Sequence, residues 1–452
     1  MTPRSDEYSR LNGCPVSLDH YSKALLSGMY DHFGQMDILP TGELFLMFRR
    51  GMTHETDEGK IVVTWMMSDG QWAPPITVAV QAGMDFRDPA GGVMPSGRIA
   101  ILTTPRTLST GDWEDMQLHV SDDYGRTWSL KQTISNGLAE YKFAHGKGVQ
   151  VGNKFVIPYY MSSGGVNSVR LLETTDSGET WTEGATIVSG LVNYNETGIC
   201  SLGGGAVLAV SRIGSGAGGK LRQFLSLDGG GTWTDQGDIT AQNTDDTNIV
   251  VAPSIALINA NGLPKVICFY TNRTLGQLRY RTHTVAGVIA GNSGWSDPQN
   301  IYSAPNLSGY QSHVVIGARV LGNFFRETTP NAVAGAFQWE AYVGDIPDYE
   351  SLWTAVLPSQ VYTFAHGLQR PPRRVEVQFS PPASGVNPSE WYEVHPTYFN
   401  DGANKGSGAQ VAISGTNVRV GTGAAVWGTA YFGGFDGTTR YTSGYYRVRA
   451  FL

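Results

Sequence analysis

The sequence predicts an all-β protein: a six-bladed β-propeller followed by a small C-terminal β-sandwich. Three observations lead to this prediction, namely a repeated turn motif, a composition rich in glycine, and strand-length apolar segments between turns. Glycine accounts for 57 of the 452 residues, aromatic residues for 11% and charged residues for only 16%. Such a composition is typical of tight turns and buried strands. The length also exceeds one ordinary core, so we expect one large and one small domain.

The pattern S/T-x-D-x-G-x-T-W occurs three times, at residues 121–128, 174–181 and 226–233. Successive tryptophans in this pattern are 53 and 52 residues apart. An Asp that accepts backbone N–H bonds, a Gly that adopts positive φ and a Trp that packs under the turn make a rigid hairpin. A repeat near fifty residues is typical of propellers and solenoids. We therefore assign the motif to a structural turn of a four-stranded blade.

Strand-length segments between these turns divide the larger domain, residues 30–345, into six units. The N-terminal segment 1–29 is expected to help close the ring. The turn pattern does not recur after about residue 356, where a new alternating pattern predicts a β-sandwich over residues 356–452 that serves assembly or glycan contact. The six predicted blades are 30–85, 86–140, 141–190, 191–243, 244–302 and 303–345.

Charge and composition exclude several classes of function. The net charge is −7 and there is no lysine- or arginine-rich run, so nucleic acid is not expected as a partner. No apolar run is long enough to insert into a membrane, and the N-terminus lacks the apolar segment of a secretory signal. The three cysteines lack metal-site spacing, and we expect no metal and no cofactor.

The repeated turns resemble the Asp-box repeats of six-bladed sialidase-like propellers, and the segment N-E-T-G-I-C-S-L-G-G-G-A-V-L-A-V-S-R carries a second resemblance. In sialidases this arrangement holds the general-base glutamate and an arginine that binds the substrate carboxylate. The resemblance implies these roles for Glu196 and Arg212. A tuned glutamate can activate a tyrosine, and a guanidinium can hold a carboxylate by two parallel bonds. An ordinary ion pair between the two residues is the alternative.

Two further catalytic residues follow from the same resemblance. The segment S-G-Y-Q-S-H-V-V-I, followed by F-F-R-E, is similar to the one that bears the sialidase nucleophile, which implies that role for Tyr310. Asp57 falls where sialidases carry their acid/base aspartate, in the loop after an early strand. Neighbouring Glu55 and Glu58 leave that assignment open, and the three acids can equally form a solvated loop. Packing alone is the alternative for the tyrosine.

The substrate-binding residues depart from the sialidase pattern at one position. The segment T-N-R-T-L-G-Q-L-R-Y-R would supply one arginine of the carboxylate-binding triad, either Arg273 or, as the fallback, Arg279. The arginine expected in the first blade is absent, and His32 lies near its place. Without that guanidinium, a plain exosialidase is not favoured. Arg87 and Asp88 in D-F-R-D-P are expected to line the mouth of the ring.

The C-terminal pattern, H-G-L-x-x-x-P-x-x-V-x-V with a terminal R-V-R-A-F, resembles small domains of bacteriophage tail fibres and tailspikes. The combined resemblance implies a phage tail protein that binds and hydrolyses a bacterial surface polysaccharide. It would be a homotrimer, contact other tail proteins, and reside in the virion after synthesis in the host cytoplasm. Two alternatives remain: a glycan-binding module without turnover, and a bacterial exosialidase.

Overall fold

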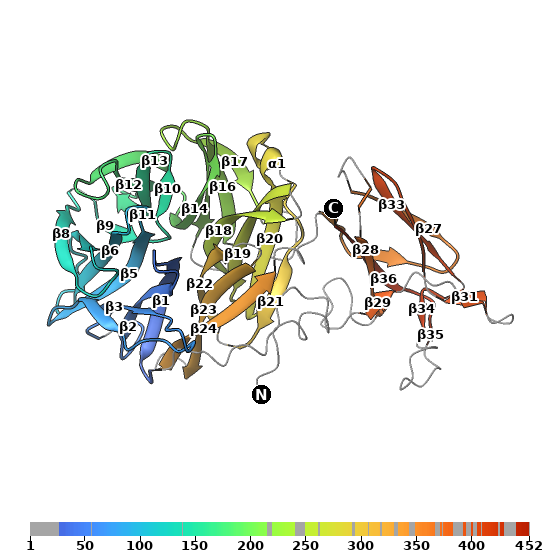
Figure 1. Ribbon diagram of the computed structural model, residues 1–452, viewed down its shortest axis with the longest axis horizontal. Helices are drawn as coiled ribbons and strands as arrows, with labels where there is room; N and C mark the ends of the chain where they lie inside the picture. The colour runs from blue at the N-terminus through green and yellow to red at the C-terminus, as the bar shows by residue number, and fades with distance from the viewer. Residues whose placement is uncertain are drawn as a thin grey trace. The chain divides into compact units, whose positions relative to one another are not determined.

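The computed structural model confirms the predicted all-β fold. Within the described residues, the one helix is the short α1 (Val285–Ile289), and strands form the rest of the regular structure (Figure 1). None of the described helices is long and apolar enough to cross a membrane. The structure describes residues 27–451 except for 56, 138, 215–218, 240–248, 261–262, 292–293, 306, 317–318, 330–332, 343–348, 367–370, 373, 383–391, 395–398, 401–404, 408, 424 and 429–439.

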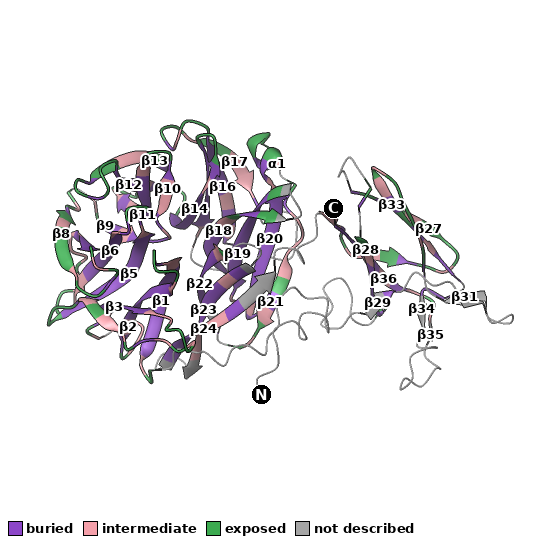
Figure 2. Ribbon diagram, viewed as in Figure 1, coloured by how far each residue is buried: buried purple, intermediate pink, exposed green. Residues whose placement is uncertain are grey.

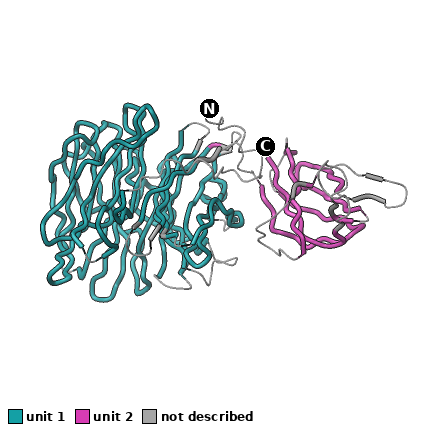
Figure 3. Tube along the Cα trace, turned by 90° about the horizontal axis from the view of Figure 1, so that it is seen from below, with its two compact units in different colours: residues 1–258, 264–343 teal, residues 259–263, 344–452 magenta. Residues whose placement is uncertain are grey.

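The chain divides into two compact units, residues 1–258 with 264–343 and residues 259–263 with 344–452 (Figure 3). The first unit holds the propeller apart from residues 259–263, and the second holds those residues and the C-terminal strands. Of the predicted N-terminal segment 1–29, only residues 27–29 belong to the described part of the chain. The predicted boundary at residue 345 falls in the range 343–348, outside the described residues.

Six groups of antiparallel strands form the propeller, and neighbouring strands within each group are joined by hydrogen bonds. The first group is β1 (Tyr30–Ile38), β2 (Leu44–Gly51), β3 (Lys60–Trp65) and β4 (Ile76–Ala79), and the second is β5 (Met84–Val93), β6 (Ile99–Thr107), β7 (Met116–Ser121) and β8 (Ser129–Ile134). The third is β9 (Tyr141–Ala144), β10 (Val149–Val151), β11 (Lys154–Ser163), β12 (Val166–Thr174) and β13 (Thr182–Gly190).

The remaining three groups complete the ring. The fourth is β14 (Tyr194–Gly203), β15 (Ala206–Ile213), β16 (Lys220–Ser226) and β17 (Thr234–Asp238), and the fifth is β18 (Val250–Ala260), β19 (Leu263–Asn272), β20 (Gln277–Thr284) and β21 (Gln299–Ser303). The sixth is β22 (Leu307–Ile316), β23 (Arg319–Thr329) and β24 (Val333–Tyr342). β24 pairs in parallel with β1 at Tyr30 and Ala334, so the first and last blades share one sheet and the ring closes there.

The three repeated motifs form the turns that the sequence predicts, between the last two strands of their blades. Asp176 accepts hydrogen bonds from the Thr180 amide (2.9 Å) and hydroxyl (2.6 Å), and the Trp181 indole donates to the Gly178 carbonyl (3.1 Å). The turns at Asp123 and Asp228 repeat these contacts. All three join outer strands of a blade, which supports a structural role.

Buried residues predominate in the inner strands of the propeller (Figure 2), and clusters of hydrophobic side chains join neighbouring blades. One cluster joins the first and second blades through Phe45, Phe86 and Ile101, and another joins the fourth and fifth through Leu208 and Cys268. The second strands of several blades contain continuous apolar runs, such as LFLMF in β2 and AVLAV in β15, because they are buried between neighbouring blades. The inner strands β1, β5 and β14 carry buried charged residues near their first residues, and these mark the candidate site.

The C-terminal unit packs two sheets around its own core. One sheet contains β25 (Tyr349–Glu350), β26 (Thr354–Val356), β28 (Arg374–Ser380), β29 (Tyr392–Val394) and β36 (Gly444–Phe451), and the other contains β27 (Val361–Ala365), β32 (Ala409–Ile413) and β33 (Asn417–Thr422). Two short pairs add β30 (Phe399–Asn400) with β31 (Lys405–Ser407), and β34 (Trp427–Gly428) with β35 (Arg440–Tyr441). Phe364, Phe379 and Val448 lie in the shared core. This is the predicted β-sandwich.

Candidate active site

The candidate residues gather at one end of the ring because of how each blade begins. In an antiparallel pair, the first residues of the inner strand lie beside the last residues of the second strand. His32 accordingly pairs with Arg49 in the first blade, and Arg87 with Thr104 in the second. The start of each inner strand and the end of its neighbour therefore face the same edge of the propeller, which we call the mouth.

A bulge interrupts the inner strand of several blades near the mouth. Register shifts occur between His32 and Gln35, Arg87 and Ala90, Tyr194 and Thr197, and Gly309 and Ser312. Bulges re-aim side chains, and non-glycine residues at positive φ mark sites where the fold holds a strained backbone. Positive φ values occur at Phe33 (56°), Asp88 (50°), Ala252 (47°) and Tyr310 (52°). A bulge and a positive φ thus occur together in the first, second and sixth blades, where they turn side chains at a corresponding position.

Glu196 and Tyr310 meet across the mouth. The Tyr310 hydroxyl donates to Glu196 Oε1 at 2.8 Å, although the two residues lie 114 positions apart in the sequence. Glu196 Oε2 accepts from Arg212 Nη1 at 2.8 Å and from the Ala252 amide at 3.1 Å. Both Glu196 and Arg212 are 6% exposed, and Tyr310 is 8% exposed. The structure therefore brings together the residues predicted as nucleophile (Tyr310), base (Glu196) and carboxylate-binding arginine (Arg212).

The surroundings give this tyrosine and glutamate opposite protonation preferences. Burial raises the pKa of Glu196, but Arg212, His145, Arg273 and the Tyr310 hydrogen bond together outweigh burial and lower it to about 2. Burial, followed by the nearby Glu196 charge, raises the pKa of Tyr310 above its ordinary value. In the protein without ligand, the phenol is neutral and the carboxylate is ionised. The pair is thus arranged as a proton donor facing a base.

Of the two alternative arginines, Arg273 reaches the site and Arg279 does not. Arg273 directly follows β19, and its guanidinium carbon lies 5.3 Å from the centre of the Tyr310 ring. Arg279 belongs to β20, the third strand of the blade, where its Nε donates to Gln277 Oε1 at 2.8 Å. Arg279, the fallback for the carboxylate-binding arginine, is therefore not at the site. Strands β18 and β19 separate it from the inner edge of its blade.

His32 occupies the place where a sialidase-like site would carry its first arginine. The side chain is 1% exposed, and its ring lies 4.7 Å from that of Tyr310. Burial and nearby cations, including His54 when protonated and Arg273, hold the pKa of His32 well below its usual range. Neither ring nitrogen has a hydrogen-bond partner among the described residues. The position therefore holds a neutral imidazole that packs beside the tyrosine.

Arg87 and Asp88 begin the second blade at the mouth. The Arg87 guanidinium lies over the Phe33 ring at 5.2 Å and near Asp85 and Glu55. Asp88 is 8% exposed. Burial raises its pKa to about 7, against the opposing effect of Arg87. This carboxyl group can therefore carry a proton near neutral pH, unlike Glu196.

The loop after β2 does not favour the predicted acid role of Asp57. Asp57 Oδ1 accepts from Thr53 N (3.1 Å), Thr53 Oγ1 (3.0 Å) and Arg49 Nη2 (3.2 Å), and Oδ2 accepts from the Met52 amide. Burial opposes ionisation, but these bonds and Arg49 lower the pKa of Asp57 overall. A carboxylate held in this way anchors its own loop and is a poor proton donor.

The two neighbouring acids are also engaged elsewhere. Glu55 faces Arg87 at 3.6 Å, and Glu58 accepts a hydrogen bond from the Gly83 amide at 2.7 Å. His54, which the sequence interpretation left out, contacts the Arg87 guanidinium at 3.5 Å, and its ring stacks on Phe33. Burial and Arg87 lower the pKa of His54 to about 4. The loop thus contributes to the mouth through residues other than Asp57.

An aromatic wall stands beside Arg87 and was not predicted as a unit. Phe143 contacts Trp113 at 4.3 Å, Tyr141 at 4.9 Å and Tyr160 at 5.2 Å between ring centres. Arg87 also lies 5.9 Å from the Trp113 ring. The alternation of Tyr141 and Phe143 in β9 was the signal that could have revealed it. Such a wall suits apolar groups or sugar faces of a ligand.

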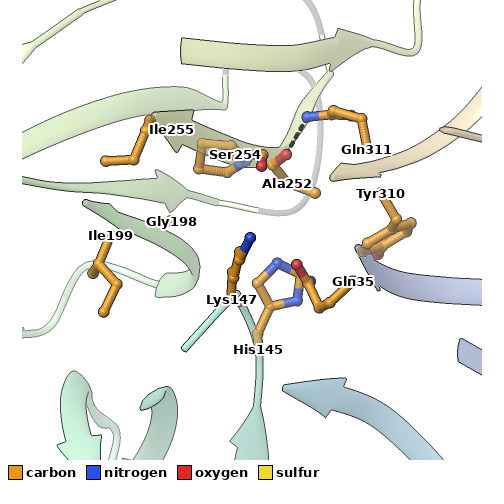
Figure 4. Close-up of a pocket in the computed structure, with 12 residues that line it drawn as sticks. Gln35, His145, Lys147, Gly198, Ile199, Ala252, Ser254, Ile255, Tyr310 and Gln311 are labelled. Atoms are coloured by element: carbon orange, nitrogen blue, oxygen red, sulfur yellow. Dashed lines mark hydrogen bonds between the residues drawn. The ribbon is translucent and has the colours of Figure 1, made fainter. Parts of the chain in front are cut away.

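A polar pocket extends from Tyr310 between the inner strands (Figure 4). His145, Lys147 and Gln35 lie close together around its centre, and Gln311 donates to the Ala252 carbonyl on its wall. His145 is 6% exposed, with its ring 6.0 Å from that of Tyr310. The sequence segment A-H-G-K-G therefore reaches the site. No group of three or more potential metal ligands occurs among the described residues.

Comparisons with known proteins agree with this architecture. The model of the BNR repeat-like domain family matches residues 42–306, and that of the PA2794-like C-terminal domain family matches residues 349–451. No curated protein sequence matches the chain significantly.

Several solved structures share the fold at low sequence identity. A Dyadobacter fermentans protein of unknown function is 15% identical, with TM-score 0.55, covering 72% of this chain and 99% of its own. The NanB sialidase from Streptococcus pneumoniae is 13% identical, with TM-score 0.56, and the coverages are 76% and 73%. For the Trypanosoma rangeli sialidase the values are 11%, 0.54, 95% and 94%. These likenesses establish a sialidase-type β-propeller fold, and because the family model spans more than half of the sequence, the chain belongs to the BNR repeat-like domain family.

Proposed function

We propose that this protein is a glycoside hydrolase that cleaves the glycosidic bond of a carboxylate-bearing sugar in a bacterial surface glycan. The observation that carries the proposal is the 2.8 Å hydrogen bond from the Tyr310 hydroxyl to Glu196, flanked by Arg212 and Arg273. A neutral phenol can approach an anionic sugar without charge repulsion, and an adjacent carboxylate can take its proton. The sialidase-type fold places this pair at the mouth of the ring.

The reaction would proceed through a covalent intermediate on Tyr310. The phenol oxygen attacks the anomeric carbon while its proton passes to Glu196 Oε1 and the bond to the leaving oxygen breaks. The leaving oxygen takes up a proton, and Asp88 is the mouth carboxyl whose raised pKa of about 7 suits that donation. Water then attacks the anomeric carbon and gives one proton to the Asp88 carboxylate, the bond to Tyr310 breaks, and Glu196 returns its proton to the phenolate. The arginines hold the sugar carboxylate throughout.

The test is the size distribution of a panel of acidic bacterial polysaccharides, polysialic acid included, after incubation with the protein. Wild type should shorten one polymer, and Tyr310→Phe and Glu196→Gln should do so at least about a hundredfold more slowly. Tyr159→Phe is the matched control, because Tyr159 also donates to a glutamate, Glu183 at 3.0 Å, within the third blade. Equal rates for Tyr310→Phe and wild type would refute the assignment.

A glycan-binding module without turnover is the second candidate, and His32 favours it. A neutral, buried imidazole in place of a guanidinium removes one charged contact to a substrate carboxylate. In the panel experiment, a polymer that is retained by the protein but stays intact would support this function. An exosialidase would instead release single sugars from the chain ends, without producing oligomers of intermediate length.

The proposal also includes that the protein is a component of a bacteriophage tail. A propeller followed by a separate β-sandwich suits a receptor-binding tail protein that contacts other tail proteins. Light scattering of the purified chain tests the proposed homotrimer, and a monomer would contradict it. Detection of the protein in purified virions tests the proposed location, and its absence from them would contradict it.

A further inference from the structure

In the protein without ligand, Arg212 forms an ion pair with Glu196. Its Nη1 lies 2.8 Å from Glu196 Oε2, and the two side chains are 7% and 8% exposed. The proposed function assigns the same guanidinium to the carboxylate of the sugar. One guanidinium would then be shared by two anions close to each other. The second anion cannot bind without changing the environment of the first.

The resting pair is poorly matched for proton transfer. The pKa of Glu196 is about 2, while that of Tyr310 is raised above its ordinary value of 10. Because one pKa is lowered and the other is raised, moving the proton from the Tyr310 hydroxyl to Glu196 is strongly unfavourable in the protein without ligand. Glu196 is therefore a weak base as long as the positive charge of its neighbours, with Arg212 foremost, is not offset by another anion.

We propose that binding of an acidic ligand at Arg212 is coupled to protonation of Glu196, so that the carboxylate of the substrate itself makes Glu196 a stronger base. The inference rests on the proposed function only for the identity of the anion. A ligand carboxylate takes up part of the hydrogen bonding and charge of Arg212 and adds its own negative charge beside Glu196. Both changes favour the protonated glutamate. A neutral ligand makes neither change.

Every charged or titratable group that faces Glu196 enters this coupling. Arg212 from β15, Arg273 after β19 and His145 after β9 favour its ionised form, as does the hydrogen bond from Tyr310 in β22. Asp88 from β5 and Tyr160 from β11 also interact with it. Asp88 is mostly protonated below about pH 6 and Tyr160 is neutral throughout. His145 is then the one other group of this set able to bind a proton in an experiment at pH 4–6.

The test measures proton uptake when an anion binds to the whole protein. Two probes are used: the sugar acid 2,3-didehydro-2-deoxy-N-acetylneuraminic acid, with its uncharged methyl ester, and trifluoroacetate, which remains ionised over this range. Titration calorimetry in buffers of different ionisation enthalpy gives the protons bound per ligand. ¹⁹F NMR follows trifluoroacetate.

In the wild type, both acidic probes should take up a proton as they bind, and their Kd should fall by as much as about tenfold per pH unit between pH 6 and 4. The methyl ester should show no such dependence. Glu196→Gln should remove it, whereas His145→Gln and Tyr310→Phe should retain it. If Glu196→Gln does not fold, the methyl ester and His145→Gln still test the coupling, because an equal pH dependence with the ester, or loss of the dependence in His145→Gln, would overturn it.

The outcomes separate this coupling from the proposed function. Equal proton uptake by wild type and Glu196→Gln, or its loss in His145→Gln alone, would overturn the coupling and leave the hydrolase proposal standing. Failure of both acidic probes to bind at millimolar concentration would remove the carboxylate site, and with it both proposals. Uptake that requires Glu196 and a charged ligand supports the coupling even if no polymer in the panel is cleaved.

Discussion

A Cβ atom placed on Gly146 would lie 2.4 Å from the carbonyl oxygen of Thr197, the residue after Glu196. Gly146 also has φ of 103°, which side chains rarely adopt. We predict that Gly146→Ala destabilises the protein by about 2–4 kcal/mol. It should also displace the strand that carries Glu196. Chemical unfolding measures the first effect.

Gly152→Ala is the control for this prediction. Gly152 also has positive φ (58°), but an added Cβ would meet nothing within 4 Å. Gly152→Ala should lower the free energy of unfolding by only about 1–2 kcal/mol, because the side chain then meets the positive-φ backbone penalty and no steric contact. If both variants lose the same stability, contact between the third and fourth blades is not what requires glycine at position 146.

His32→Arg tests whether the missing arginine can simply be restored. His32 is 1% exposed, and its neutral form is favoured by Arg273, Arg49 and Arg87. A cation there would be buried among cations without an acidic partner, so we expect a loss of about 3 kcal/mol or more. His32→Gln, which keeps the site neutral, should lose less. A stable His32→Arg protein with improved capture of acidic sugars would contradict this account.

Arg49→Met should be among the most destabilising substitutions in the first blade. Arg49 is fully buried and donates from Nε to Asp85 Oδ1 at 2.7 Å, and Asp85 is also fully buried. Removing the arginine leaves a buried carboxylate without its main partner, which costs about 3–5 kcal/mol. Thermal unfolding should show the loss directly.

Arg98→Met provides the comparison, because Arg98 also contacts two acids. Its partners Asp122 and Glu179 are 65% and 57% exposed, so this surface network should contribute at most about 1 kcal/mol. The prediction fails if the two variants melt at similar temperatures.

The fold could be predicted from sequence because its signals are local. Each repeated turn is specified within eight residues, and the contacts of Asp176 and Trp181 span only three or four positions. Glu196 and Arg212 could be paired for a similar reason, since the hairpin of β14 and β15 sets Tyr194 opposite Ile213. Neighbouring residues of that hairpin then meet at the mouth.

The rest of the site depends on contacts that no local pattern encodes. Arg273 and Arg279 lie six positions apart around one turn, and only the completed blade shows which of them reaches Tyr310. Asp57 has the spacing of a catalytic acid, but its hydrogen bonds to Thr53 and Arg49 hold it ionised. Closure of the ring and the local hydrogen bonds decide these roles.

Asp88 and Asp57 should affect the pH dependence of stability in opposite directions. The pKa of Asp88 is raised to about 7 by burial, so the folded protein holds a proton that the unfolded chain loses above about pH 4. The protein should therefore lose stability relative to Asp88→Asn as pH rises from 4 to 8, by on the order of 4 kcal/mol. The pKa of Asp57 is lowered, so its contribution is present above about pH 4 and disappears as pH falls.

Urea unfolding of wild type, Asp88→Asn and Asp57→Asn at pH 4, 6 and 8 measures both effects without any substrate. The free energy of unfolding of Asp88→Asn should rise relative to that of wild type as pH increases toward 8, because the amide stays neutral in the buried site. Asp57→Asn should be less stable than wild type at pH 6 and 8. Its stability should approach that of wild type at lower pH, where Asp57 is protonated in the unfolded chain. If Asp88→Asn and wild type keep a constant difference across this range, Asp88 is ionised in the folded protein and has no proton to give a leaving group.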